Sequence, residues 1–470
     1  MQKKSKLVNN FIIYAIGNLG SKLLVFLLLP LYSYYLTQSE FGSYDIIMTL
    51  IGFIAPIVSC QINQGLYRYI LDTNDEKEKS RIITNSYFIV IKNLIIFILL
   101  VLLIQLFYKF QFVYLVLFQV IFMCTQDITL QVARGLEKNK EYSYAGMLNT
   151  LVNLISNIIL IVFLGLKVEA LLISIILSSV VSILYIAKTI DLFQYINFSM
   201  VNGKIRNELL KFSLPLIPNA LSWWVTNLSD RYLLLYYKGI ESTGIYAIAN
   251  KLPSILITIN TIFYLAWQDT VISEHDSNKK DYSKMFSLLM VLQCTAAIGL
   301  ISINKYLMKF LVSPDFYEAW KYTPFLYVGV VFSVFSSFYG VFYLSVKNTK
   351  GNFYTSVIGA LINIVLNVVL IPVIGIQGAS LSTMISYIVI FIMRAVHTKE
   401  FVNVDIDTKK FLLLNFLMGI YIYLSYIENF ILSVILIVGG VLVFGYLNLE
   451  FIKKFGSYFG KRKLKSKAIN

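Results

Sequence analysis

Apolar runs of about twenty residues, separated by short polar segments, follow one another along the whole chain. An apolar helix of that length crosses the hydrocarbon core of a bilayer, which is about 30 Å thick. The pattern therefore predicts an all-α integral membrane protein with about fourteen transmembrane helices. Their expected ranges are 8–32, 41–66, 82–107, 111–133, 143–165, 168–190, 209–233, 243–272, 285–304, 323–346, 354–372, 377–396, 410–427 and 430–450.

Polar and aromatic positions within these runs recur in register in the second half of the chain. At an offset of 202, the residues Tyr34, Tyr35, Gly42, Tyr44, Ile46 and Leu50 match Tyr236, Tyr237, Gly244, Tyr246, Ile248 and Leu252. At an offset of 210, the residues Lys140, Tyr144, Asn153, Asn157, Ile161, Gly165 and Leu171 match Lys350, Tyr354, Asn363, Asn367, Ile371, Gly375 and Leu381. Such an internal duplication is typical of transporters, in which the substrate path runs between the two copies.

The duplication predicts a bundle of six helices in residues 1–200 and a second bundle of six in residues 201–400. Residues 401–470 then supply two additional transmembrane helices and a basic tail. Because six is even, both bundles have the same orientation in the membrane, and a pseudo-two-fold axis along the membrane normal is expected to relate them.

The charge of the chain follows this topology. The sequence is 58% hydrophobic and 14% charged, with a mean hydropathy of +0.73 and a net charge of +15. Thirty of the forty Lys and Arg residues fall on one face of the predicted topology, seven fall on the other face and three lie within helices. The positive-inside rule then places both termini in the cytoplasm. The basic residues are explained by topology and by attraction to anionic lipid, and they do not indicate a nucleic-acid partner.

Few residues are available for metal, cofactor or catalytic chemistry. The chain has three cysteines, each within an apolar run, and two histidines, both in loops. It shows no paired carboxylates, nucleophile motif or glycine-rich phosphate loop, and no long outer loop that could carry catalytic residues. We therefore expect neither a cofactor nor an enzyme.

A lysine in the middle of the first expected helix is the strongest candidate for substrate binding. Lys22 lies on one polar stripe with Tyr14, because these residues and Asn10 and Asn18 are spaced four apart. A buried ionisable group costs about 2.5–3.5 kcal/mol on insertion scales, so Lys22 should face a bundle interior, where it could attract a diphosphate or an acidic sugar. The alternative is a lysine that reaches the interface or pairs with an acid.

Three other cations are weaker candidates. Lys251 is expected near the middle of the eighth helix, on a stripe that includes Tyr246. Lys92 lies in the third helix, about ten residues from its cytoplasmic end, so it could equally reach the interface. Arg68 ends the second helix, where it could meet an entering diphosphate or act as a positive-inside anchor.

The acids are candidates for ion coupling or gating. Asp127 and Asp45, in the fourth and second helices, could hold a proton or Na⁺ or pair with a buried lysine. Asp269, near the inner end of the eighth helix, is a weaker candidate. The neighbours Asp230 and Arg231 are expected to form an ion pair that adjusts a gate at the outer end of the seventh helix.

The repeated asparagine pairs have a four-residue spacing, so both members of a pair face the same way. These pairs are Asn153 with Asn157 and Asn363 with Asn367. Amides at this spacing hydrogen-bond between transmembrane helices, and we expect packing rather than substrate contact.

An ordered set of short motifs resembles one transporter family. It includes Ser39-Glu40-Phe41-Gly42-Ser43-Tyr44, Gly65-Leu66-Tyr67-Arg68-Tyr69, Phe212-Ser213-Leu214-Pro215-Leu216-Ile217-Pro218, Asp230-Arg231, Ala266-Trp267 and Gly375-Ile376-Gln377-Gly378-Ala379. Over roughly residues 7 to 450 the chain resembles the polysaccharide-biosynthesis oligosaccharide flippases of the Wzx type, which share a superfamily with MATE multidrug exporters and lipid II flippases. The family often has Pro shortly after Ala-Trp, whereas this chain has Gln268 and Asp269.

The resemblance implies two bundles around a central cavity in the cytoplasmic membrane. It implies alternating access that moves an undecaprenyl-diphosphate-linked oligosaccharide to the outer leaflet, for O-antigen, capsule or exopolysaccharide assembly, coupled to an H⁺ or Na⁺ gradient. A polysaccharide polymerase and a chain-length regulator would then be partners. The alternatives are a MATE-like antiporter of cationic drugs, for which cavity acids rather than lysines are expected, and a lipid II flippase.

Overall fold

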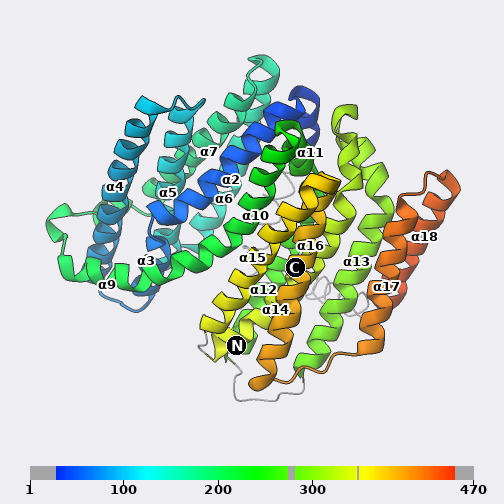
Figure 1. Cartoon of the computed structure of the whole chain (residues 1–470). Coiled ribbons are helices and arrows are strands. Elements are labelled where there is room, and N and C mark those ends of the chain that lie inside the picture. The colour runs from blue at the N-terminus through cyan, green and yellow to red at the C-terminus, as the bar shows by residue number, and fades with distance from the viewer. Residues whose placement is uncertain (1–27, 274–280, 347–348, 450–470) are drawn as a thin grey trace, which may run out of the picture. The chain divides into compact units, whose positions relative to one another are not determined.

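The computed structural model describes residues 28–273, 281–346 and 349–449, and Figure 1 shows the elements that they form. Every regular element in these ranges is a helix, which confirms the all-α prediction. Ten of the helices in these ranges are long and apolar enough to cross a membrane. The chain is therefore a multi-pass membrane protein.

The chain divides into two compact units. Unit 1 comprises Met1–Lys251 with Asn363–Ile376, and unit 2 comprises Leu252–Ile362 with Gln377–Asn470. The division expected from the duplication, at residues 200 and 400, remains a prediction.

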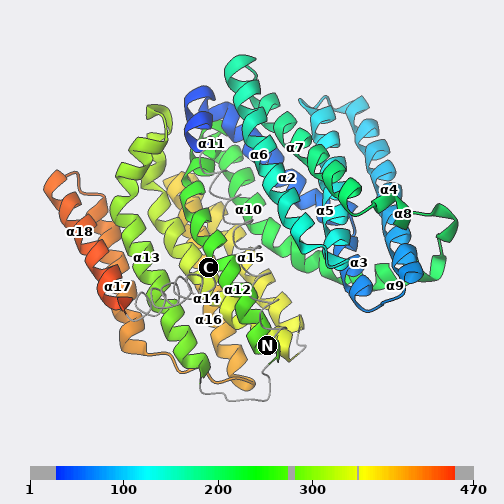
Figure 2. The same ribbon diagram turned by 180° about the vertical axis from the view of Figure 1, so that it is seen from behind.

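Unit 1 is built around α5. This helix packs against α2, α3, α4 and α7, and its residues Val120, Cys124 and Ile128 are fully buried in the apolar core (Figures 1 and 2). The helices of unit 1 are α2 (Gln38–Val58), α3 (Ile62–Leu71), α4 (Glu76–Phe107), α5 (Val113–Gly135), α6 (Asn139–Ile158), α7 (Val168–Thr189), α8 (Leu192–Tyr195), α9 (Gly203–Ser213), α10 (Ile217–Lys238), α11 (Ile240–Ala249) and the second part of α15 (Thr349–Ile374).

Unit 2 has an aromatic core. The indole of Trp267 stacks on the ring of Phe338 with 4.3 Å between centroids, and its Nε1 donates a hydrogen bond of 3.1 Å to the Phe338 carbonyl. The C-terminal hairpin of α17 and α18 packs on α13 (Figure 2). The long helices of unit 2 are α12 (Lys251–Ser273), α13 (Asp281–Leu311), α14 (Thr323–Ser345), α16 (Ile376–His397), α17 (Thr408–Ser425) and α18 (Phe430–Leu447).

The second expected helix, 41–66, is broken in the structure. Helix α2 ends at Val58 and α3 begins at Ile62, because Cys60 and Gln61 adopt left-handed φ values of 50° and 52°. The side chain of Asn93 supports the break, since its Nδ2 donates hydrogen bonds of 3.0 Å to the Val58 carbonyl and 3.2 Å to the Cys60 Sγ. The sequence did not reveal this break, because the two left-handed positions are occupied by Cys60 and Gln61. Glycine, the residue that usually marks such a backbone conformation, is absent from both positions.

The eighth expected helix, 243–272, is also two helices. Helix α11 ends at Ala249, α12 begins at Lys251, and a turn at Asn250 separates them. The Nδ2 of Asn250 donates a hydrogen bond of 2.8 Å to the Tyr246 carbonyl and satisfies an acceptor at the end of α11. Lys251 therefore lies at a helix junction rather than in the middle of a continuous helix.

The duplicated segments meet at a pair of matching glycines, one on α2 and one on α11. A Cβ added to Gly42 would lie 2.3 Å from the Ile240 carbonyl oxygen, and a Cβ added to Gly244 would lie 2.0 Å from the Gln38 carbonyl oxygen. Gly42 matches Gly244 and Gln38 matches Ile240 at the offset of 202, so the two contacts are reciprocal. The two copies of the repeat cross with their backbones in close approach, and the reciprocity of the contacts is that expected of a pseudo-two-fold relationship.

The variant Gly244→Ala should test this crossing. Its methyl group meets a backbone carbonyl that cannot rotate away, so the two helices must separate, and we expect a loss of about 1–3 kcal/mol of stability. Thermal unfolding of the detergent-solubilised protein measures the loss. The control is Gly146→Ala on α6, where an added Cβ has no neighbour within 4 Å. Equal melting temperatures for the two variants would contradict the close crossing.

Candidate functional site

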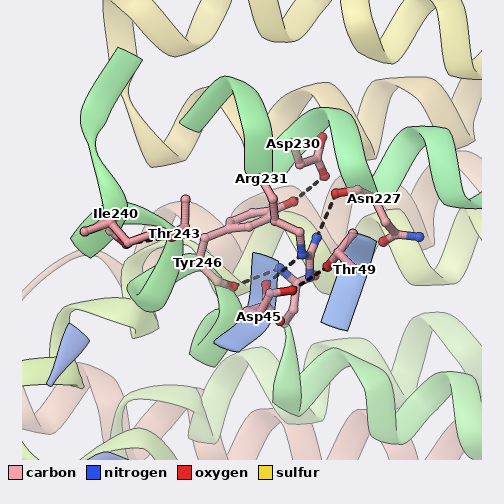
Figure 3. Close-up of polar contacts among 9 residues, drawn as sticks. Asp45, Thr49, Asn227, Asp230, Arg231, Ile240, Thr243 and Tyr246 are labelled. Atoms are coloured by element: carbon pink, nitrogen blue, oxygen red, sulfur yellow. Dashed lines mark hydrogen bonds and ion pairs between the residues drawn. The ribbon is translucent and has the colours of Figure 1, made fainter. Parts of the chain in front are cut away.

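An ion pair joins α2 to α10 in the interior of unit 1. The Nε of Arg231 lies 2.7 Å from the Oδ2 of Asp45, and the two side chains are only 10% and 13% exposed (Figure 3). The Nη1 of Arg231 also donates a hydrogen bond of 3.2 Å to the Asn227 carbonyl one turn earlier. Burial makes the pair interdependent, because removal of either partner leaves the other charge without compensation.

An aromatic ring supports the guanidinium of Arg231 from another side. The Cζ of Arg231 lies 5.5 Å from the ring centroid of Tyr246, a residue of α11 that is fully buried. A cation within about 6 Å of a ring centroid is attracted to the π face of the ring. Arg231 therefore holds α2, α10 and α11 together (Figure 3).

The neighbouring carboxylate, that of Asp230, accepts hydrogen bonds from a different set of side chains. Its Oδ2 accepts a hydrogen bond of 2.6 Å from the Tyr246 hydroxyl, and its Oδ1 accepts bonds of 3.1 Å and 2.7 Å from the Nδ2 atoms of Asn363 and Asn367. Asp230 is 2% exposed. These three donors satisfy a buried carboxylate that has little contact with water.

The structure thus differs from the expected ion pair between Asp230 and Arg231. Adjacent residues on a helix point about 100° apart, so their side chains reach different neighbours. Arg231 turns to Asp45, and Asp230 turns to Tyr246 and the two asparagines of α15. The two residues belong to one network, but each is held by partners elsewhere in the fold.

The two asparagine pairs of the repeat have diverged. In the first copy, Asn157 donates from Nδ2 to the carbonyl and to the Oδ1 of Asn153, at 2.8 and 3.2 Å, within its own helix. In the second copy, the amides of Asn363 and Asn367 bind the carboxylate of Asp230. The position that matches Asp230 at the offset of 202 is Leu28, so only the second copy has a carboxylate at this position for the asparagines to bind. Sequence reasoning missed this role because it treated both pairs alike.

The variant Asn367→Leu should separate the two roles of the repeated amides. Hydrogen bonds to charged groups contribute about 1.5–3 kcal/mol, so loss of the Asn367 amide should lower stability by that amount. The matched control is Asn157→Leu, which removes only bonds within one helix. Chemical denaturation in mixed micelles measures the free energy of unfolding of both variants. A cost for Asn157→Leu equal to or above that for Asn367→Leu would exclude a special role for the second pair.

The other predicted cations have described contacts with other residues, are exposed, or lie outside the described residues. Lys22 and Tyr14 fall in the part of the chain that the structure does not describe. The Nζ of Lys251 lies 5.6 Å from the ring centroid of Phe41 on α2. Lys92 is exposed on α4, and Arg68 is exposed and lies 3.3 Å from Asp72 in an ion pair one turn along its helix.

The remaining predicted acids are Asp127 and Asp269. Asp127 is half-buried on α5, beside Gln126, whose Oε1 accepts a hydrogen bond of 3.0 Å from Ser179 on α7. The side chain of Asp269, on α12, lies outside what the structure describes. Of the residues singled out from the sequence, the structure brings together Asp45, Asp230, Arg231, Tyr246, Asn363 and Asn367.

The arrangement of helices is that of known membrane transporters. The chain matches a structure of the lipid II flippase MurJ in an inward closed conformation with a TM-score of 0.71, at 17% identity, over 94% of this chain and 99% of that chain. It matches an inward-facing structure of a multidrug resistance MATE family transporter with a TM-score of 0.68, at 13% identity, over 87% of this chain and 95% of that chain. At these identities the likeness defines the fold, which is that of the MOP superfamily of transporters.

Residues 7–268 match the model of the family described as polysaccharide biosynthesis protein, and the chain belongs to that family. A curated relative is an uncharacterized membrane protein of Methanocaldococcus jannaschii, 26% identical over 281 residues. The match spans about half of each chain, 54% of this one and 54% of the relative. The family is thus that of polysaccharide biosynthesis proteins, and the fold is one found in membrane transporters.

Proposed function

We propose that the chain moves undecaprenyl-diphosphate-linked oligosaccharides from the cytoplasmic to the outer leaflet of the cell membrane. The product would supply O-antigen, capsule or exopolysaccharide assembly, together with a polysaccharide polymerase and a chain-length regulator. Family membership supports the substrate class, and the transporter fold supports alternating access.

The observation that carries the mechanism is the buried network between the two copies of the repeat. Asp45 belongs to the first copy, and Arg231, Asp230 and Tyr246 belong to the second. With both termini in the cytoplasm, α2 starts and α10 ends at the outer face. Asp45 and Asp230 then lie within about two turns of that face, roughly 12 Å at 1.5 Å per residue. In this topology the ion pair holds the outer side closed, and its opening releases substrate outward.

Asp230 is the residue that we propose for ion coupling. Carboxylate and amide oxygens are the ligands that hard cations prefer. The Oδ1 of Asn367 is buried and accepts no hydrogen bond from the described residues, so it is available to a cation beside Asp230. If the two amides turn, their oxygens and the Asp230 carboxylate together offer several oxygen ligands to a single Na⁺. We therefore propose Na⁺ as the coupling ion.

A genetic experiment tests the proposed function. The gene is deleted from its host and restored as wild type or as Asp45→Ala. Loss of surface polysaccharide, with undecaprenyl-linked units accumulating on the cytoplasmic side and rescue by the wild type only, is the expected result. Normal polysaccharide with altered drug sensitivity would overturn the proposal and support a multidrug antiporter, and loss of peptidoglycan synthesis would support a lipid II flippase.

A further inference from the structure

The end of α7 and the segment that follows it form an exposed surface of aromatic and basic residues on unit 1. Phe193 and Phe198 are 79% and 57% exposed, and Phe212 at the end of α9 is also exposed. Lys188, Lys204 and Lys211 are exposed on the same segment, against the two exposed acids Asp191 and Glu208. We call residues 188–214 the linker surface.

The linker surface is held firmly against α4 by polar side chains that bind its backbone. Thr84 donates to the Tyr195 carbonyl at 3.1 Å and accepts from the Asn197 amide at 3.0 Å. Asn85 donates to the Met200 carbonyl at 3.1 Å and accepts from the Asn202 amide at 2.8 Å. Both side chains are fully buried. The exposed phenylalanines therefore lie on a segment whose backbone is fixed to α4 by hydrogen bonds.

Helix α9 is amphipathic within this surface. Leu209 and Ser213 are buried, and Ile205 and Leu210 pack against the apolar core of unit 1, while Lys204 and Lys211 remain exposed. The helix packs on α3 and α4, and both views show it beside their ends (Figures 1 and 2). The protein thus covers the apolar face of α9, and the exposed phenylalanines beside the helix are the apolar groups that can enter the boundary between acyl chains and headgroups.

We propose that the linker surface binds anionic phospholipid of the leaflet that the predicted topology makes cytoplasmic. The phenylalanines enter the acyl region, where large exposed aromatic side chains lose contact with water. The lysines lie at the level of the phosphates and bind them as point charges. An excess of positive charge on the same segment gives this surface its preference for anionic over zwitterionic headgroups. This inference does not depend on which substrate the protein transports.

Native mass spectrometry of the full chain, carrying either phosphatidylglycerol or phosphatidylethanolamine, tests the proposal. We expect the wild type to retain phosphatidylglycerol in preference to phosphatidylethanolamine. Each lysine near a charged surface is worth about 1 kcal/mol, so Lys188→Gln/Lys204→Gln/Lys211→Gln should reduce that preference by about tenfold or more. Glycerol phosphate added in solution should not displace the bound lipid, because it lacks the acyl chains.

Two further variants separate a defined surface from general attraction. Lys138→Gln/Lys140→Gln/Lys399→Gln removes the same charge from exposed positions elsewhere on the predicted cytoplasmic face and should leave the preference unchanged. Phe193→Ser/Phe198→Ser should weaken retention of both lipids, since it removes the apolar anchor. Equal losses for the two lysine variants, or no loss for either, would overturn the proposal. All substituted side chains are exposed, and unchanged melting temperatures confirm that the variants remain folded.

Discussion

Replacement of Asp45 by alanine should abolish polysaccharide export and strongly destabilise the protein. The change leaves the buried guanidinium of Arg231 without its carboxylate, and breaking one side of a buried pair costs about 3–5 kcal/mol. The variant Arg231→Ala should cost as much, because it leaves Asp45 buried without its partner. The free energy of unfolding and the amount of surface polysaccharide, measured for both variants, report independently on the loss of the ion pair.

The double variant Asp45→Ala/Arg231→Ala is the informative control. Because neither charge remains, it should cost less than the sum of the two single changes, and the difference measures their coupling. The chain also offers a matched exposed pair, Arg68 and Asp72, at 3.3 Å. Exposed pairs contribute about 0–1 kcal/mol, so Asp72→Ala should leave stability almost unchanged. Additive costs at Asp45 and Arg231 would contradict the coupled pair.

Replacement of Asp230 by asparagine should uncouple transport from the ion gradient while leaving the protein folded. A tenfold Na⁺ gradient supplies ~1.4 kcal/mol per ion, and 100 mV of membrane potential supplies ~2.3 kcal/mol per charge. The variant keeps the shape of the side chain but cannot carry a compensating negative charge. In proteoliposomes the wild type should accumulate its substrate when a Na⁺ gradient is applied, and Asp230→Asn should reach only equal distribution.

The control for this prediction is Asp127→Asn, which neutralises the half-buried acid of α5. We expect it to keep the response to Na⁺, because Asp127 is outside the network of Asp230. Loss of coupling in Asp127→Asn, with coupling retained in Asp230→Asn, would contradict the prediction and place the ion-coupling site at Asp127 on α5. A wild type that responds to a proton gradient alone would identify H⁺ as the coupling ion.

The fold could be predicted from the sequence to a large extent, since its signals are long and repeated. Apolar runs of membrane-spanning length predicted the helices, and the 202-residue offset predicted that matching segments are related by symmetry, as the reciprocal contacts of Gly42 and Gly244 show. The breaks at Cys60 and at Asn250 could not be predicted. Each depends on local backbone conformation and on a single asparagine, which hydropathy does not register.

The candidate site was predictable by residue type and not by partner. Asp45 stood out as an acid in an apolar helix, and Asp230 and Arg231 stood out as neighbouring opposite charges at the end of one. Their pairing required knowledge of which faces meet, because α2, α10 and α15 are far apart in sequence. The ion pair of 2.7 Å between Asp45 and Arg231 joins residues in different copies of the repeat, and no spacing along the chain predicts this pair.

The most direct test of the central claim is a flipping assay with the purified full chain. Undecaprenyl-diphosphate-linked oligosaccharide is placed in the leaflet that corresponds to the cytoplasmic side of proteoliposomes, and a lectin measures its appearance on the other side. The account predicts that wild-type protein exposes the sugar when a Na⁺ gradient is applied and that Asp45→Ala does not. Sugar that stays on its original side with folded wild-type protein would contradict the account.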